Sequence, residues 1–96
     1  MTAYVVYQGV VTDPEGYERY KVMAQESIAA AGGRYVVRAG EVTVLEGEPP
    51  EGRVVLLEFP SVEAALGWYH GEAYAPARAL RAEVARARMY VVDGVV

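Results

Sequence analysis

The chain has 96 residues, of which 53% are hydrophobic, so it corresponds to one globular domain over 1–96 and intrinsic disorder is excluded. Nine basic against thirteen acidic residues give a net charge of −4, which argues against nucleic-acid binding because that function needs a basic face. Because the sequence has no cysteine, no apolar run of membrane-spanning length and no secretory signal, we expect a cytoplasmic protein without disulfides, thiolate metal sites or membrane contact.

Asparagine is absent, and eight arginines stand against the single Lys21. A low content of thermolabile amides is typical of heat-adapted proteins. A GC-rich genome, whose codons favour Ala, Gly, Arg and Val, would produce the same composition. Both interpretations stay open.

The N-terminal third of the chain predicts one strand followed by one helix. Residues 3–11 are β-branched and aromatic, as is typical of a strand. Asp13 can cap a helix whose first turn contains Pro14, and the apolar residues that follow recur on one helical face. Gly32-Gly33 is expected to end this helix.

A hairpin is predicted next. Residues 34–38 and 41–46 have the composition of two short strands, joined by a tight turn at Ala39-Gly40. Arg38 and Glu41 flank this turn, so we expect them to face each other as a cross-strand ion pair.

The segment after the hairpin predicts a loop, a strand and a helix. Residues 47–52 are rich in Gly, Pro and Glu and indicate a loop, and residues 53–59 form the most apolar strand of the chain. Ser61 can cap the following helix. The face of that helix expected in the core consists of Val62, Ala65, Leu66 and Tyr69. Trp68 lies about 100° away from Tyr69, at the margin of this face, where it could line a pocket or pack on the partner subunit.

The C-terminal third predicts a second helical stretch and a last strand. Gly71 interrupts the first helix. The second stretch runs from about 73 to 86, with an apolar stripe of Ala77, Leu80 and Val84. Residues 88–93 close the chain as a strand.

With the predicted hairpin counted as one unit, the order of elements is β-α-β(hairpin)-β-α-β, and the second helix is broken into two pieces. This is the ferredoxin-like arrangement of the α+β class, in which helices cover one face of an antiparallel sheet. A sheet with one wet face should alternate apolar and polar residues, but here apolar residues run consecutively, as in Val54-Val55-Leu56-Leu57 and Val91-Val92. We therefore expect both faces to be buried, one by the helices and the other by the same face of a second copy, in a homodimer.

Several segments together carry a resemblance to a known family. They are GGRYVVRAGE at 32–41, VLEG at 44–47 and LEFPS at 57–61, with Ala64-Ala65, Trp68-Tyr69, Tyr74, Leu80-Arg81 and Asp93-Gly94. Their order and spacing resemble the bacterial family of the domain of unknown function thirteen-thirty. This resemblance implies ferredoxin-like subunits that pair into a dimeric α+β barrel.

The resemblance leaves the activity open. The same superfamily includes cofactor-free monooxygenases, muconolactone-type isomerases and haem-binding relatives of chlorite dismutase, and a fold does not imply a function. The sequence departs from the family at two positions. It has His70 where the family usually has an acid or an amide, and Ala39 where the family usually has a second glycine.

His70 is the candidate catalytic residue. It is the only histidine, and histidine is the side chain whose unperturbed pKa lies near neutrality, so it could act as an acid or a base. It also lies at the end of a predicted helix, where a cation is favourable without any catalytic role. With one histidine and no cysteine, we expect no metal site in the subunit.

A second group of candidates follows Gly71. Tyr74, Arg78 and Arg81 recur at i, i+4 and i+7 and so share one helical stripe, which could hold a carboxylate or a phosphate. Alternatively, the arginines lie over apolar surface and pair with acids such as Glu58. Tyr74 and Arg81 also match the family pattern, so they are the ligand-binding candidates of this stripe.

Arg38, Glu58 and Trp68 complete the candidate ligand-binding residues. Glu58 interrupts an apolar strand, where a carboxylate either finds a basic partner or has a raised pKa, as groups at functional sites often do. Arg38 and Trp68 could serve a site or have a structural role.

The break at Gly71 would let His70 and Trp68 converge with Tyr74 and Arg81 on one tyrosine-lined cavity between sheet and helices. Such a cavity would suit a small anionic or aromatic molecule. Two classes of function follow. One is an enzyme that needs no cofactor and acts by proton transfer or monooxygenation, and the other is a non-catalytic binding or structural dimer.

Overall fold

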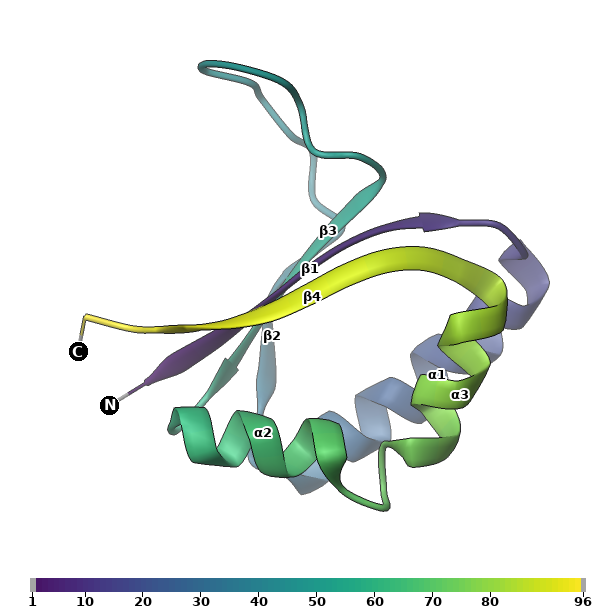
Figure 1. The fold of residues 1–96 in the computed structure, drawn as a ribbon, viewed down its shortest axis with the longest axis vertical. Coiled ribbons are helices and arrows are strands. Elements are labelled where there is room, and N and C mark those ends of the chain that lie inside the picture. The colour runs from purple at the N-terminus through teal and green to yellow at the C-terminus, as the bar shows by residue number, and fades with distance from the viewer. Residues whose placement is uncertain (1, 96) are drawn as a thin grey trace.

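The structure is a computed structural model that describes residues 2–95. In chain order the elements are β1 (Ala3–Val11), α1 (Pro14–Ala30), β2 (Arg34–Arg38), β3 (Arg53–Phe59), α2 (Val62–His70), α3 (Ala75–Val84) and β4 (Ala85–Asp93). The strands form one antiparallel sheet in the order β2-β3-β1-β4, and the helices lie on one side of it (Figure 1). This is the predicted ferredoxin-like fold. None of these helices is long and apolar enough to cross a membrane.

The helix ends follow the signals in the sequence. The carboxylate of Asp13 accepts a hydrogen bond from the backbone N–H of Gly16 at 3.2 Å, and Pro14 occupies the first turn of α1. After α1 the chain turns through Gly32, whose φ of +82° is in the left-handed region. The Ser61 hydroxyl caps α2 by accepting from the backbone N–H of Ala64 at 3.0 Å. These predicted boundaries are confirmed.

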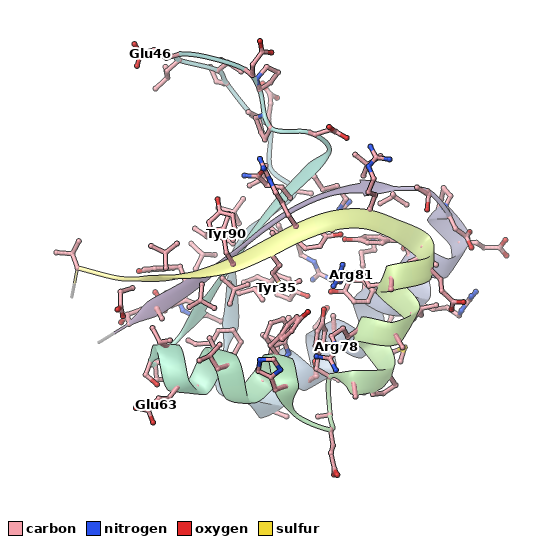
Figure 2. The ribbon with its side chains drawn as sticks, in the orientation of Figure 1. Tyr35, Glu46, Glu63, Arg78, Arg81 and Tyr90 are labelled. Atoms are coloured by element: carbon pink, nitrogen blue, oxygen red, sulfur yellow. The ribbon has the colours of Figure 1, made fainter. Side chains whose placement is uncertain are left out.

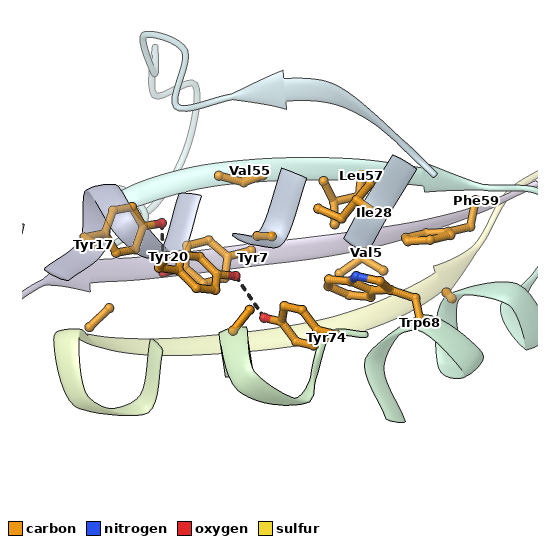
Figure 3. Close-up of a cluster of buried hydrophobic side chains, with 14 of the residues drawn as sticks. Val5, Tyr7, Tyr17, Tyr20, Ile28, Val55, Leu57, Phe59, Trp68 and Tyr74 are labelled. Atoms are coloured by element: carbon orange, nitrogen blue, oxygen red, sulfur yellow. Dashed lines mark hydrogen bonds between the residues drawn. The ribbon is translucent and has the colours of Figure 1, made fainter. Parts of the chain in front are cut away.

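The core lies between the helices and the face of the sheet that they cover, which we name the inner face. Alternate residues of the two central strands point into it, and aromatic side chains from the helices pack on them (Figure 3). The largest fully buried side chains are Tyr74, Phe59 and Val5. The opposite face, which we name the outer face, is covered by no element within residues 2–95. Its central residues are Tyr4, Val6, Gln8 and Val10 of β1, Val54, Leu56 and Glu58 of β3, and Arg86, Arg88, Tyr90 and Val92 of β4.

The predicted hairpin is wrong. β2 pairs with β3, so that Tyr35 lies opposite Leu57, and residues 41–46 form no strand. Pairing with β3 is favoured because that strand brings apolar side chains such as Leu57 into the core. Ala39 adopts a left-handed φ of +58°, and residues 39–52, which we name the arm, leave the sheet on the side opposite the helices (Figure 1).

The predicted ion pair between Arg38 and Glu41 is also absent from the described part of the chain. Without a strand at 41–46, no cross-strand position exists for Glu41. Arg38 instead donates a hydrogen bond from Nη1 to Oε1 of Gln25 on α1, at 3.0 Å.

The predicted core face of α2 is rotated. Trp68 is buried, with 4% of its surface exposed, whereas Leu66 is 44% exposed and Tyr69 is only partly buried. The reason is a polar partner from another element, because the indole N–H of Trp68 donates to the hydroxyl of Ser27 on α1 at 3.0 Å. Placing Trp68 at the margin of the core was therefore wrong.

The last helix is shorter than predicted and the last strand is longer. α3 spans Ala75–Val84 rather than 73–86, and β4 begins at Ala85 rather than at 88. The earlier start follows from pairing with β1, in which Ala85 lies opposite Val11 and Arg86 opposite Val10. Tyr74 thus precedes α3 as its N-cap residue.

Candidate functional site

A cavity of about 30 Å³ lies between α1 and the inner face of the sheet. Its volume is sufficient for roughly one or two water molecules. We name it the tyrosine cleft, because its polar lining consists of Tyr7, Tyr17, Tyr20, Tyr35, Lys21, Arg38 and Arg53. Trp68, Met89 and core residues of α1 and β3 complete the lining.

The phenols of the cleft are hydrogen-bonded in pairs (Figure 3). Tyr17 donates to the hydroxyl of Tyr7 at 3.3 Å, and the hydroxyls of Tyr20 and Tyr74 lie 2.8 Å apart. Burial raises the pKa of Tyr7 and of Tyr20 well above the usual 10.0, and the neighbouring phenol raises it further in each case. Both phenols are therefore neutral near pH 7 and can donate hydrogen bonds.

Arg81, which points from α3 toward the sheet (Figure 2), provides a positive charge for these phenols. Burial lowers the pKa of its guanidinium, but the phenols of Tyr74, Tyr20 and Tyr7 raise it by more, and the net shift is upward. Its Nε is buried, and no group within residues 2–95 accepts a hydrogen bond from it. Tyr74 and Arg81 thus lie close together, as predicted, although Tyr74 precedes the helix instead of belonging to it. No carboxylate in the described residues forms an ion pair with Arg81.

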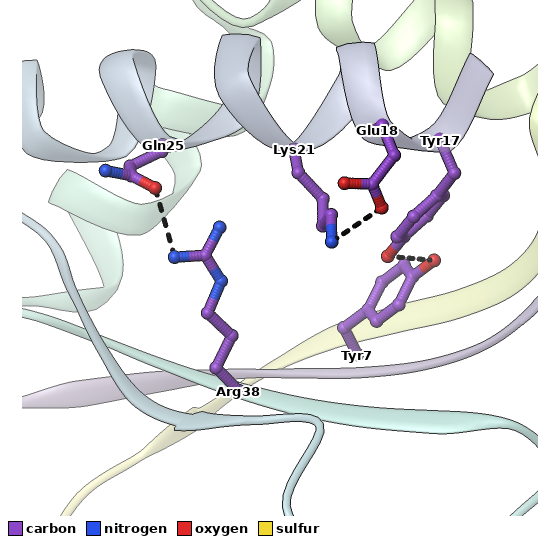
Figure 4. A network of polar contacts seen from close by, with 6 residues as sticks. All are labelled: Tyr7, Tyr17, Glu18, Lys21, Gln25 and Arg38. Atoms are coloured by element: carbon purple, nitrogen blue, oxygen red, sulfur yellow. Dashed lines mark hydrogen bonds and ion pairs between the residues drawn. The ribbon is translucent and has the colours of Figure 1, made fainter. Parts of the chain in front are cut away.

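Three further cations line the cleft. Arg38 reaches from β2 toward α1, and Lys21 reaches from α1 toward the sheet (Figure 4). The Arg38 guanidinium lies 4.3 Å from the centre of the Tyr35 ring, and that of Arg53 lies 5.2 Å from the centre of the Tyr17 ring. These distances fit cation–π contacts.

The charge of these cations is only partly compensated. Lys21 forms an ion pair with the exposed Glu18 at 2.7 Å, and Arg38 bonds to the neutral Gln25. The Nε of Arg53 is buried and has no hydrogen-bond partner among residues 2–95. Since no carboxylate is among the lining residues of the cleft, the site as a whole favours an anion.

The predicted candidates divide into two groups. Arg38 and Trp68 line the cleft, and Tyr74 and Arg81 lie directly behind it, through contact with Tyr20. His70 does not join them. It is exposed at the end of α2 and lines a second hollow of about 320 Å³ next to β4, together with Trp68, Tyr69 and Tyr90. Trp68 borders both spaces, so His70 lies beside Trp68 as predicted but not beside Tyr74 and Arg81.

Glu58 is also remote from the cleft. Its side chain lies on the outer face, because its neighbours Leu57 and Phe59 take the inward positions of β3. There it pairs with Nε of Arg34 at 2.7 Å and accepts a hydrogen bond from Tyr4 at 3.2 Å. Arg78, the third member of the predicted stripe, lies over the Tyr69 ring instead of facing the cleft.

Lys21 and Arg53 are cleft residues that the sequence analysis missed. A signal for Arg53 was present, since it has the same strand parity as the buried Val55 and Leu57. A charged residue at an inward strand position is a candidate for a site. A signal for Lys21 was its position four residues after Tyr17, which places both on one side of the helix. Within residues 2–95, no group of three or more His, Asp and Glu side chains is arranged to hold a metal ion.

Comparison with protein families is decisive for the classification. The family model of the domain of unknown function DUF1330 matches residues 2–95. The chain belongs to the DUF1330 family. This confirms the resemblance found in the sequence. The search of curated proteins finds no match for this DUF1330 chain.

Solved structures that resemble this DUF1330 chain share its fold at low sequence identity. RPA0582, a protein of unknown function from Rhodopseudomonas palustris, is 17% identical, with a TM-score of 0.77 over 99% of this chain and 83% of its own. SnoaB from Streptomyces nogalater, a cofactor-independent oxygenase, is 12% identical, with a TM-score of 0.68 over 99% and 94%. A dimeric ferredoxin-like protein of unknown function from Bacteroides fragilis is 13% identical, with a TM-score of 0.54 over 97% and 96%.

Proposed function

We propose that this protein binds a small aromatic molecule that carries an ionised oxygen, and that the tyrosine cleft is the binding site. One observation carries the proposal. The cleft is lined by Lys21, Arg38 and Arg53 together with five aromatic side chains, and no carboxylate is among its lining residues. Aromatic rings contact an aromatic ligand, and guanidinium groups bind an oxyanion through paired hydrogen bonds.

Binding requires the cleft to open. A volume of about 30 Å³ is too small for an aromatic ring. Arg38 and Arg53 lie over the rings of Tyr35 and Tyr17, and both are long, flexible side chains. If they swing outward, the two tyrosine rings are uncovered, and each guanidinium exchanges a ring contact for a contact with the anion.

If the protein is an enzyme, we expect it to act on the bound anion without a cofactor. The neutral phenols of Tyr7 and Tyr20 are donors that can stabilise a developing oxyanion, and the positive charge of Arg81 lies beside them. Neither histidine nor carboxylate lines the cleft, so the substrate is expected to bind already ionised. The likeness to a cofactor-independent oxygenase supports a monooxygenase step of this kind.

Such a step balances without a reductant. The ring C–H carbon para to the ionised oxygen would react with dioxygen and become a carbonyl, while the phenolate oxygen becomes the second carbonyl of a quinone. One oxygen atom of dioxygen enters the product, and the other leaves as water with the ring hydrogen and one proton from the solvent. Non-catalytic binding is the second candidate function, and the lack of a general base in the cleft favours it.

We further propose that the protein is a homodimer through its outer face. This face carries Val6, Val54 and Leu56 at its centre, with Tyr90 and Val92 exposed on β4. The ferredoxin-like relative described as dimeric supports this assembly. The interface should bury more than roughly 1,000 Å². Light scattering at micromolar concentration should give the mass of a dimer, and a monomeric mass would contradict the proposal.

Fluorescence of Trp68 tests the binding proposal, because it is the only tryptophan and it lines the cleft. Salicylate should change the emission with saturation, and the neutral salicylamide should bind at least about tenfold more weakly. Arg53→Met and Arg38→Met should each weaken salicylate binding by about tenfold. Arg19→Met, at an exposed position of α1 outside the cleft lining, is the matched control and should bind like the natural protein.

Equal binding of salicylate and salicylamide, or unchanged binding in both cleft variants, would refute the proposed site. Dioxygen uptake then separates the two candidate functions. An enzyme of the proposed kind should consume dissolved dioxygen with an acidic phenol such as 1-naphthol, and Arg81→Met should slow that uptake. Saturable binding with no uptake would leave the non-catalytic function.

A further inference from the structure

The arm is the least expected element of the fold. Its fourteen residues, 39–52, connect two antiparallel neighbours, β2 and β3, without regular secondary structure. Connections of this length in compact domains usually have a function. The arm projects beyond the outer face, with Glu46 at its tip (Figure 2).

The base of the arm is held in place. Gly52 adopts a left-handed φ of +76°, and it passes so close to the backbone of Gly9 that a Cβ atom would not fit there. Glu51 forms an ion pair with Arg86 of β4. The fold therefore positions the arm to project on the outer side of the sheet.

The arm carries apolar side chains that nothing in residues 2–95 covers. Leu45 is 93% exposed, and Val42 and Val44 are each 46% exposed. The segment 41–46 also has the β-branched composition of a strand, yet it pairs with no strand of the described chain. Both properties indicate a segment whose partner lies outside the subunit.

The charge of the arm identifies a complementary surface on this same protein. The arm contains Glu41, Glu46, Glu48 and Glu51 and no basic residue. Only Glu51 has an ion-pair partner among residues 2–95. β4, an edge strand of the sheet, presents Arg86 and Arg88 on its outer face. Arg88 bonds only to the neutral Gln8, at 2.8 and 3.0 Å, so its charge is not neutralised.

We propose that the arm of one subunit docks on β4 of a second copy, with its acidic tip at Arg88 and its apolar segment beside Tyr90. This inference rests on the proposed dimer through the outer face and specifies how that dimer is held. In a two-fold dimer the contact occurs twice, because each subunit gives an arm and receives one. Charge complementarity then selects a second copy of this chain rather than an unrelated apolar partner.

Complementary charge reversal tests the docking. Arg88→Glu should raise the dimer dissociation constant by about tenfold or more, and the double variant Glu46→Arg/Glu48→Arg should do the same. When the two variants are mixed, each heterodimer has one natural contact and one contact with both charges reversed. The mixture should therefore regain the affinity of the natural dimer, measured by sedimentation equilibrium at low salt.

Glu63→Arg supplies the matched control, since Glu63 is exposed on α2, far from the arm tip (Figure 2). This variant should leave the dissociation constant unchanged. A mixture that associates no more tightly than either variant alone would overturn the docking. A natural protein that is monomeric at micromolar concentration would overturn the dimer itself, which separates the failure of the two proposals.

Discussion

On the inner face of the sheet Val55 and Leu57 are buried under the helices, whereas on the outer face their neighbours Val54 and Leu56 are only half-buried. These four residues are consecutive in one strand. The inner pair contacts side chains of the same chain, and the outer pair contacts none of its helices. One apolar run thus has a buried inner half and a half-buried outer half. In the proposed dimer, the outer half would form a second core with another copy.

Polar groups differ between the two faces in the same way. The inner phenols of Tyr20 and Tyr74 bond to each other, and burial raises the pKa of Tyr20. Outer groups such as Arg34 and Glu58 form an exposed ion pair. A change to an inner group should therefore affect folding or ligand binding, and a change to an outer group should affect association.

The largest expected difference between the faces is between Leu57→Ala and Leu56→Ala. Leu57 is buried with 3% exposed, so its truncation should cost about 2–5 kcal/mol of unfolding free energy. Leu56→Ala should cost less than about 1 kcal/mol in dilute monomer, but it should weaken the dependence of the urea midpoint on protein concentration. Urea denaturation at two protein concentrations measures both effects, and equal losses at low concentration would contradict the distinction.

The phenol pair should show a smaller effect with strong coupling. Tyr20→Phe leaves the buried hydroxyl of Tyr74 without its 2.8 Å partner, so it should cost about 1–3 kcal/mol. Tyr20→Phe/Tyr74→Phe should cost less than the sum of the two single variants, because it removes both hydroxyls. Tyr90→Phe, at an exposed outer position, is the control and should change stability by less than about 0.5 kcal/mol. If the losses of unfolding free energy in the two single variants add up to the loss in the double variant, the two hydroxyls are not coupled.

Ala39→Gly should be stabilising, since Ala39 has a φ of +58° at the start of the arm. A left-handed conformation costs a residue with a Cβ about 1–2 kcal/mol, and the greater freedom of glycine in the unfolded chain offsets about 0.4–1 kcal/mol. The net gain should be about 0.5–1 kcal/mol, seen as a rise in melting temperature. Ala82→Gly, at an exposed position in α3, should instead lower stability by about 1 kcal/mol.

The smallest effect is expected from the ion pair on the outer face, and it depends on pH. The hydrogen bond from Arg34 holds the pKa of Glu58 below its usual 4.5. A carboxyl whose pKa is lower in the folded state stabilises that state above pH 4.5, and the contribution is lost as the pH falls through the lowered value. Glu58→Gln should thus melt slightly below the natural protein at pH 7, and the difference should vanish in acid. A difference in melting temperature that does not change with pH would exclude this ion pair as the cause.

Local signals predicted the helix starts, because a cap is formed by residues three apart. Asp13 with Pro14 and Ser61 are such signals, and both helices begin where expected. The partner of β2 could not be predicted in this way. The segments 41–46 and 53–59 both resemble strands, and the choice between them depends on which one brings side chains under α1.

Local signals also predicted some residues of the candidate site but not others. The sequence indicated a tyrosine-lined cavity and named Arg38, Trp68, Tyr74 and Arg81, all of which lie in or directly behind the cleft. It also named His70 and Glu58, which lie elsewhere. A helical period indicates that a residue is near a face but not which element lies opposite it.

The sequence by itself determined the family, the ferredoxin-like order of elements and the apolar character of both faces of the sheet. Each of these depends on the local spacing and the types of residues along the chain. Only the tertiary structure decided the rotation of α2, the cations of the cleft and the course of the arm. Trp68 turns inward because its indole N–H reaches Ser27, 41 residues earlier in the chain. Contacts across such separations depend on how whole elements pack, and no local pattern in the chain encodes them.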